Sequence, residues 1–159
     1  MTVPKSFVAL CLMAICSAIA CTEKSGGAHP APCLVVSYDN GYHEATGSSS
    51  KLQITPDSSY LVTQNSSGVT TKKLSDALHD SLKPYLSSFP REAVKADSNV
   101  LNYSYRGAAD APFVGFTYIQ ENTGDSTVIY LDLPSENPSY IKAFQQQINQ
   151  TISNNKIFN

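Results

Sequence analysis

The apolar residues of this chain recur with two different periods, and each period predicts a different kind of element. Short runs rich in β-branched and aromatic residues, bounded by turn-forming residues, are typical of strands. Such runs lie at residues 33–39, 51–55, 60–63, 100–105, 113–120 and 127–133. A proline and an aspartate in 56–59 favour a tight turn between the second and third runs. Gly124, in 121–125, predicts a hairpin loop between the last two.

Two other segments carry apolar residues at spacings of three and four, which predicts amphipathic helices. In the first, these residues are Leu74, Leu78, Leu82, Tyr85, Leu86 and Phe89. Ser75 is placed to cap this helix, and Asp76 lies in its first turn, where the helix dipole favours a negative charge. Because Pro84 has no backbone N–H to donate, we expect a kink or break near Lys83 and a short second segment ending at Ser87.

The second helix is predicted to start with Asn137 as its cap and Pro138 at the first helical position, where the missing donor costs little. Its apolar stripe consists of Tyr140, Ile141, Phe144, Ile148 and Ile152. Strands joined by hairpins need an antiparallel sheet, and two amphipathic helices need a sheet face to cover. The sequence therefore predicts an α+β fold, with an antiparallel sheet of about six strands and two amphipathic helices packed on one face.

The first 20 residues have the layout of a secretory signal peptide. Lys5 supplies one positive charge, and residues 7–20 then contain no charged side chain. As a helix these 14 residues would rise about 21 Å, which is less than the roughly 30 Å hydrocarbon core of a bilayer. We expect this segment to direct export and not to span the membrane permanently.

Cys21 follows Ser17-Ala18-Ile19-Ala20, and this junction resembles the lipobox of bacterial lipoproteins. Cys11 and Cys16 each follow a large apolar residue, so neither has the small residue that lipobox cleavage requires. The resemblance implies that Cys21 is acylated and anchors the chain to a membrane. Aspartate after the cysteine is the usual inner-membrane retention signal in the enteric family, and Thr22 stands there instead. The outer membrane is therefore the expected location.

The alternative interpretation of the same junction is cleavage after Ala20 and plain secretion, without acylation of Cys21. Removal of residues 1–20 leaves Cys21 and Cys33, which could form a disulfide in an oxidising compartment. A thioether-linked lipid on Cys21 would prevent that bond, and Cys33 would then be buried as a small hydrophobic residue. The two interpretations of Cys21 exclude each other.

Beyond the cysteine, residues 21–32 are polar and rich in glycine and proline, which is typical of a flexible tether. Residues 33–159 are expected to form a single domain, because 139 residues after cleavage suffice for one core and not comfortably for two. That mature chain carries 10 basic and 13 acidic side chains, and its longest block of like charge is Lys72-Lys73. Nucleic acid is not an expected partner, since phosphate binding needs a concentrated basic surface.

The sequence shows no catalytic or metal-binding signature. His29, His43 and His79 are far apart, and we expect all three at the surface. The segment after Asp39 lacks the ligand spacing of an EF-hand. No serine lies in a Gly-x-Ser-x-Gly elbow. Acid pairs such as Asp132 and Glu136 are expected in any chain with this many acids. No enzyme, cofactor or metal is therefore predicted.

Nine tyrosines and no tryptophan suggest a contact surface, because tyrosine combines a large apolar area with a polar tip. Tyr103 and Tyr105 share one side of a predicted strand, and Tyr118 and Tyr130 are expected on facing strands. Half-buried sheets are also rich in tyrosine for packing reasons alone. The other candidate contact site is the loop from Asp39 to residue 50, with Gly41, Tyr42 and His43.

The order of elements over roughly residues 34–152 resembles that of emfourin-type metalloprotease inhibitors and related small envelope proteins. The shared features are a first strand ending near Gly41, a paired strand, a leucine-rich helix, a hairpin and a closing helix. This sequence lacks the double glycine common after that strand. We therefore expect a lipid-anchored, non-catalytic module that binds another envelope or secreted protein, with protease inhibition as one form of this function. A cell-wall hydrolase is the alternative from another class.

Overall fold

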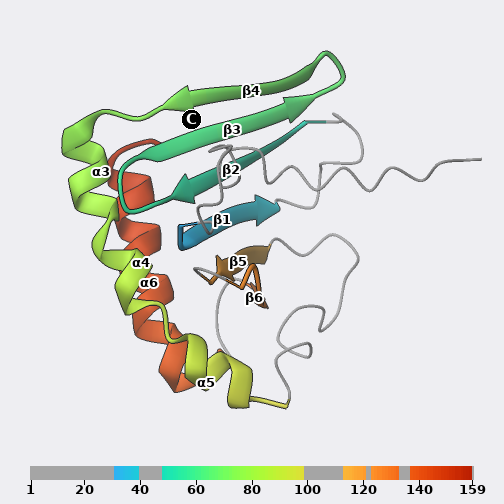
Figure 1. Cartoon of the computed structure of the whole chain (residues 1–159), viewed down its shortest axis with the longest axis vertical. Coiled ribbons are helices and arrows are strands. Elements are labelled where there is room, and N and C mark those ends of the chain that lie inside the picture. The colour runs from blue at the N-terminus through green and yellow to red at the C-terminus, as the bar shows by residue number, and fades with distance from the viewer. Residues whose placement is uncertain (1–30, 40–47, 99–112, 121–122, 133–136, 159) are drawn as a thin grey trace, which may run out of the picture.

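The computed structural model describes residues 31–39, 48–98, 113–120, 123–132 and 137–158. These residues form an α+β fold in which a six-stranded antiparallel sheet is combined with helices. The strands run in the spatial order β4-β3-β2-β1-β5-β6, and Figure 1 shows this order from top to bottom, with the helices gathered on one side of the molecule. The fold class predicted from the sequence is confirmed.

The strands are β1 (Cys33–Asp39), β2 (Ser49–Ile54), β3 (Ser59–Asn65), β4 (Gly68–Lys73), β5 (Phe113–Ile119) and β6 (Ser126–Asp132). Five of the predicted runs correspond to β1, β2, β3, β5 and β6, and the predicted run at 100–105 lies outside the described residues. The turn between β2 and β3 closes through a hydrogen bond from the Thr55 N–H to the Ser58 oxygen (3.0 Å). Gly124 has a positive φ of 70°, as the predicted hairpin loop between β5 and β6 requires.

Strand β4 was not predicted from the sequence. Its residues, Gly-Val-Thr-Thr-Lys-Lys, contain one large apolar side chain and no alternation of apolar and polar positions. A two-residue turn connects it to β3, with Asn65 paired to Gly68 and the Asn65 side chain accepting a hydrogen bond from the Ser67 N–H (2.9 Å). Gly68 has a φ of 130°, which side chains rarely tolerate. In the sequence, β4 is therefore indicated by its turn residues Asn65 and Gly68 and not by the composition of the strand.

The leucine-rich segment forms three short helices, where a helix with one kink or break near Lys83 was predicted. They are α3 (Asp76–Leu82), α4 (Pro84–Ser88) and α5 (Arg91–Ala96). Ser75 caps α3 by accepting a hydrogen bond from the Leu78 N–H (3.3 Å), and the predicted break falls between Lys83 and Pro84. The second break and α5 were not predicted; there the backbone of Phe89 turns extended, with ψ of 125°, and Pro90 follows.

The closing helix is α6 (Ser139–Asn154), the longest of the described helices. Its start differs by one residue from the prediction, because Pro138 occupies the N-cap position and makes no side-chain capping bond. Asn137 instead donates a hydrogen bond through its side-chain amide to Gln145. Four of the five predicted stripe residues are buried, namely Ile141, Phe144, Ile148 and Ile152, and Tyr140 is partly buried against them.

The register of the strands places the buried apolar side chains of the sheet at matching alternate positions. Leu34 lies opposite Ile54 on β2 and Tyr118 on β5. Val36 lies opposite Leu52 and Phe116 in the same two strands. These side chains form one hydrophobic cluster with residues of the four described helices. A single core thus joins the sheet to the helices.

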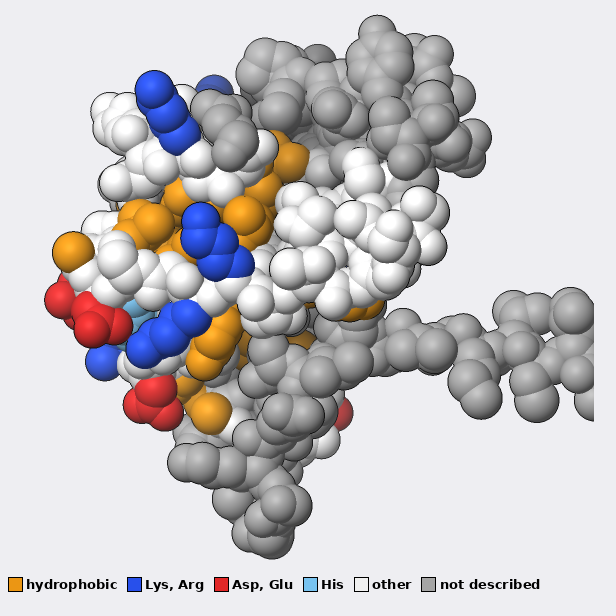
Figure 2. Space-filling model, turned by 90° about the horizontal axis from the view of Figure 1, so that it is seen from above, with side chains coloured by type: hydrophobic (Ala, Val, Ile, Leu, Met, Phe, Trp, Pro, Cys, Tyr) orange, Lys and Arg blue, Asp and Glu red, His pale blue; other side chains and the backbone are white. Residues whose placement is uncertain are grey.

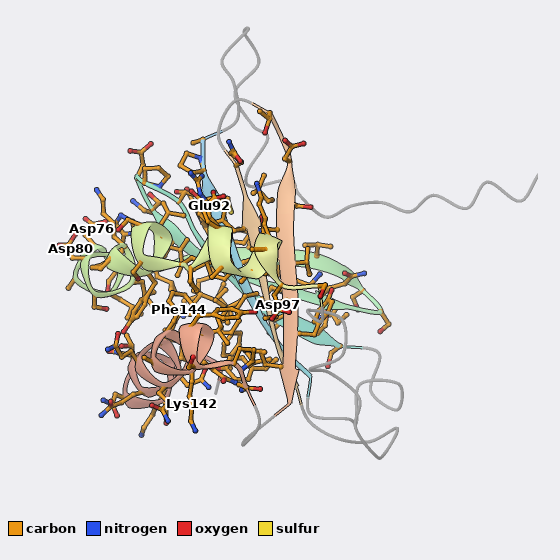
Figure 3. All side chains as sticks on the ribbon, turned by 90° about the horizontal axis from the view of Figure 1, so that it is seen from below. Asp76, Asp80, Glu92, Asp97, Lys142 and Phe144 are labelled. Carbon is orange, nitrogen blue, oxygen red and sulfur yellow. The ribbon has the colours of Figure 1, made fainter. Side chains whose placement is uncertain are left out.

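Aromatic rings connect the helices to the sheet at the centre of this core. Phe144 of α6 contacts Phe89 and Phe116 edge to face, with ring centroids 5.5 and 5.3 Å apart. Figure 3 shows Phe144 pointing into the space between α6 and the other helices, whereas Lys142 points away from it. Among the described residues, no helix combines the length and apolar character that crossing a bilayer would need.

Candidate functional site

The contact site predicted at the end of β1 lies mostly outside the described residues. Asp39 is the last residue of β1 and its backbone pairs with Phe113 of β5. Gly41, Tyr42, His43 and the predicted lipidation site Cys21 are not among the described residues. Because β1 lies between β2 and β5, the loop that follows Asp39 starts from an interior strand of the sheet.

Cys33 begins β1, is completely buried and is disulfide-bonded. The other three cysteines of the chain, Cys11, Cys16 and Cys21, are outside the described residues. A disulfide is the state expected of an exported chain. It also bears on Cys21, since a cysteine cannot be both acylated and disulfide-bonded.

His79 was predicted at the surface, and the structure shows it buried, with 7% of its surface exposed. It lies on α3 three residues before the buried Leu82, so it belongs to the side of the helix that faces the core. Its Nδ1 atom is 2.9 Å from the hydroxyl oxygen of Ser59 on β3. This hydrogen bond satisfies both buried polar groups and ties α3 to β3.

A serine hydroxyl bonded to a histidine also resembles the nucleophile and base of a covalent catalyst. Ser59, however, has no exposed surface, so a substrate cannot reach its oxygen. The described residues supply no carboxylate hydrogen-bonded to the His79 ring. They also contain no group of three metal-ligating side chains. The Ser59–His79 pair is therefore interpreted as a structural contact.

Two of the tyrosines that suggested a binding surface lie on opposite faces of the sheet. Tyr118 pairs with Thr127 and its ring stacks on Phe89 with the ring centroids 5.7 Å apart, in the core. Tyr130 pairs with Gly115 on the neighbouring strand and is 39% exposed. Side chains alternate between the two faces along a strand, and Gly115 is three residues from Tyr118 on β5. Tyr130, which lies opposite Gly115, is therefore on the other face from Tyr118. Tyr103 and Tyr105 lie outside the described residues.

Other tyrosine hydroxyls hold α6 to the rest of the fold. The Tyr38 hydroxyl donates to the Asn149 side chain, and Tyr85 donates to the Gln147 carbonyl oxygen at 3.0 Å. Tyr140 donates to the Asp97 carboxylate at 2.7 Å. Burial raises the pKa of Tyr38 to about 12, because desolvation disfavours the tyrosinate. For Tyr38, Tyr85 and Tyr140, contacts within the fold explain why tyrosine is present.

The most accessible strand of the sheet is β4, which sequence analysis missed. All six of its residues are exposed, and Val69 is exposed by 50%. The opposite edge, β6, is different: Thr127, Ile129 and Leu131 are buried, and α5 packs against that strand. Among the described residues β4 is therefore the edge where a sheet ends without being covered.

Half of the backbone polar groups of β4 point away from the sheet. The Leu74 N–H, immediately after β4, donates to the Ser59 oxygen of the neighbouring segment (2.9 Å). In an antiparallel ladder alternate residues direct their N–H and C=O groups to the same side. Gly68, Thr70 and Lys72 have the same parity as Leu74 and face β3, so the backbone groups of Val69, Thr71 and Lys73 face outward. No described strand lies beyond them.

The charge at this edge is positive. Lys72 and Lys73 lie on opposite faces of β4, and Lys51 on β2 shares a face with Lys73. Residues 48–73 contain these three lysines and one acid, Asp57. Lys73 also contacts Asp76 at 3.5 Å, although both side chains are largely exposed. Figure 2, which looks onto the β4 end of the sheet, shows basic side chains separated by hydrophobic ones, with acidic side chains at one margin.

Comparisons with known proteins find no matching protein family, no matching curated protein and no matching solved structure. The β4 edge and the predicted loop after Asp39 are the two candidate contact sites.

Proposed function

We propose that this protein is an exported, non-catalytic module that binds another protein of the bacterial envelope or its surroundings. The observation that carries this proposal is β4, a six-residue strand whose residues are all exposed and which is the last strand at one edge of the described sheet. An uncovered strand edge offers hydrogen-bond donors and acceptors to another chain. The rigid core behind it would present that edge without rearrangement.

Protease inhibition is the form of binding suggested by the resemblance to emfourin-type proteins. In that form the loop with Asp39, Gly41, Tyr42 and His43 would enter the protease cleft. The double variant Tyr42→Ala/His43→Ala is the direct test, with thermolysin as the probe protease. Inhibition by the wild type and its loss in the variant would support the loop as the inhibitory site, whereas equal inhibition by both would exclude it.

A cell-wall hydrolase is the competing class, and one assay separates it from a binding module. Purified protein is incubated with peptidoglycan sacculi, and soluble muropeptides are measured. We expect no release. Ser59 has no exposed surface, so the hydrogen-bonded Ser59–His79 pair is not proposed as a catalytic centre. Turnover of the sacculi that disappears in His79→Gln would contradict the proposal.

Lipid anchoring through Cys21 is proposed from its lipobox-like junction, with the outer membrane as the location. Plain secretion is kept as a second candidate because Cys33 is disulfide-bonded, and cleavage after Ala20 would leave a chain with two cysteines, Cys21 and Cys33. Mass spectrometry of the mature N-terminus, with Cys21→Ser as the matched control, distinguishes the two. An acylated Cys21 supports anchoring. A Cys21–Cys33 disulfide overturns anchoring and leaves the export and binding proposals in place.

A further inference from the structure

We infer that β4 is a docking edge for an extended, acidic segment of the partner protein, which adds to the sheet as a seventh strand. This inference rests on the proposed protein-binding function and names its site and the chemistry of its partner. The outward backbone groups of Val69, Thr71 and Lys73 supply the hydrogen bonds for such a strand. An added strand would pair with β4 in the way that β4 pairs with β3.

The side chains that flank this edge define the preferred partner sequence. Lys72 lies on one face and Lys73 on the other, so an incoming strand meets one ammonium group on each face. Acidic residues at neighbouring positions of that strand would pair with both lysines, since opposite charges across a strand pair are favourable. Val69 and Thr71 accept apolar or β-branched neighbours at the other end of the strand.

A second copy of this chain is a poorer occupant of the same edge. Antiparallel pairing of two β4 strands about Thr71 would bring together four lysines and no acidic strand residue. In that register Lys72 of each copy is diagonal to Lys72 of the other on the same face, at a separation of roughly 8 Å. Like charges at that distance repel, and lysines on edge strands are a common device against such self-pairing. An acidic segment turns the same lysines into attractive contacts.

The inference is tested with labelled synthetic peptides of about six residues, the usual length of a strand. One carries two adjacent glutamates among valines, so that one glutamate lies on each face; a second carries two adjacent lysines among valines, and a third is the glutamate peptide with a central proline. Fluorescence anisotropy with the purified protein should show binding of the first peptide, at least about tenfold weaker binding of the second, and none of the third. Added salt should weaken binding of the glutamate peptide.

Two variants of β4 make the test specific. Thr71→Pro removes an outward N–H and leaves the ladder to β3 intact, because proline is tolerated at the outer side of an edge strand. It should lower affinity for the glutamate peptide by at least about tenfold, whereas Thr71→Ala, which keeps the N–H, should not. Lys72→Glu/Lys73→Glu should reverse the preference in favour of the lysine peptide. This charge reversal remains informative if Thr71→Pro fails to fold.

Amide hydrogen exchange locates the added strand directly. Binding of the glutamate peptide should slow exchange at Val69, Thr71 and Lys73, while Thr70 and Lys72 are already bonded to β3 and should change little.

Equal affinity for all three peptides, protection at β6 instead of β4, or dimerisation abolished by Thr71→Pro would overturn the inference. If the wild type inhibits a protease but binds none of the three peptides, the docking edge is wrong and the protein-binding function stands. Peptidoglycan turnover without peptide binding would overturn both.

Discussion

Tyr38 shows how a single, partly buried side chain links the sheet to the last described helix. It lies on β1, donates a hydrogen bond to Asn149 of α6, and its ring contacts Phe158 edge to face at 5.0 Å. Desolvation raises its pKa from 10.0 to about 12. The neutral side chain is therefore part of the folded structure.

The raised pKa of Tyr38 predicts a loss of stability at alkaline pH. The unfolded chain releases the tyrosine proton near pH 10, and the folded protein retains it up to about pH 12, so the free energy of unfolding should fall between these values. Denaturant unfolding across this range measures the decline, and tyrosinate absorbance reports the ionisation. Tyr38→Phe should have a shallower alkaline decline. Identical profiles for the two proteins would contradict the assignment.

Because the hydrogen bond between Ser59 and His79 is buried, removing the Ser59 hydroxyl should measurably lower the free energy of unfolding. Ser59→Ala leaves the His79 Nδ1 atom buried without this partner, so the free energy of unfolding should fall by about 1–2 kcal/mol. Ser81→Ala is the matched control, because the Ser81 hydroxyl is exposed and bonds only a carbonyl of its own helix. Its effect should stay within about 0.5 kcal/mol. Equal effects would mean that the buried bond contributes nothing specific.

Among the secondary-structure elements, helix starts differ in how far local sequence specifies them. Ser75 caps α3 as its residue type and position predict. Helix α6 begins after Pro138 without a side-chain cap, and its position depends on the buried stripe from Ile141 to Ile152. Packing thus replaces capping at the longer helix, as expected where a large apolar face is available.

This difference predicts unequal results for two similar substitutions. Ser75→Ala removes the acceptor of the Leu78 N–H bond and should lower the free energy of unfolding by about 1 kcal/mol. Ser139→Ala, at the first residue of α6, removes no capping bond and should be nearly neutral. Thermal and denaturant unfolding of the two variants provide the comparison. A larger loss of unfolding free energy in Ser139→Ala than in Ser75→Ala would contradict the conclusion that capping matters for α3 and not for α6.

The molecule as a whole is held together by one core to which the sheet and the helices all contribute. Phe144 is central to it, because its ring also meets Tyr85 of α4 edge to face, with centroids 5.8 Å apart. Removal of this side chain affects α4, α6 and β5 together. Its loss should therefore weaken the fold as one cooperative unit.

Phe144→Ala should lower the free energy of unfolding by about 3–5 kcal/mol. Lys142→Ala on the exposed side of the same helix should change it by less than about 0.5 kcal/mol. Circular dichroism of the helices and hydrogen exchange of the sheet should lose structure at the same denaturant concentration in Phe144→Ala. Separate transitions for helix and sheet would contradict a single cooperative core.

The elements that follow a strong local pattern could be predicted from the sequence. The β-branched and aromatic run of β1, the turn at Thr55–Ser58, the Ser75 cap and the break before Pro84 each depend on residues close together in the chain. For the candidate site the prediction was weaker. The loop after Asp39 remains a prediction, and β4 was missed because a strand with all of its side chains exposed carries no hydrophobic alternation.

Local residue patterns therefore predicted β1, β2, β3, β5, β6, α6 and the antiparallel class of this protein, but not β4 or α5. Tertiary structure alone decided which sides are buried. It placed His79 against Ser59, put Tyr118 and Tyr130 on opposite faces, and made β4 an edge strand of the sheet that the described residues form. Burial depends on which strands become neighbours, and that order is set by contacts between residues far apart in the sequence.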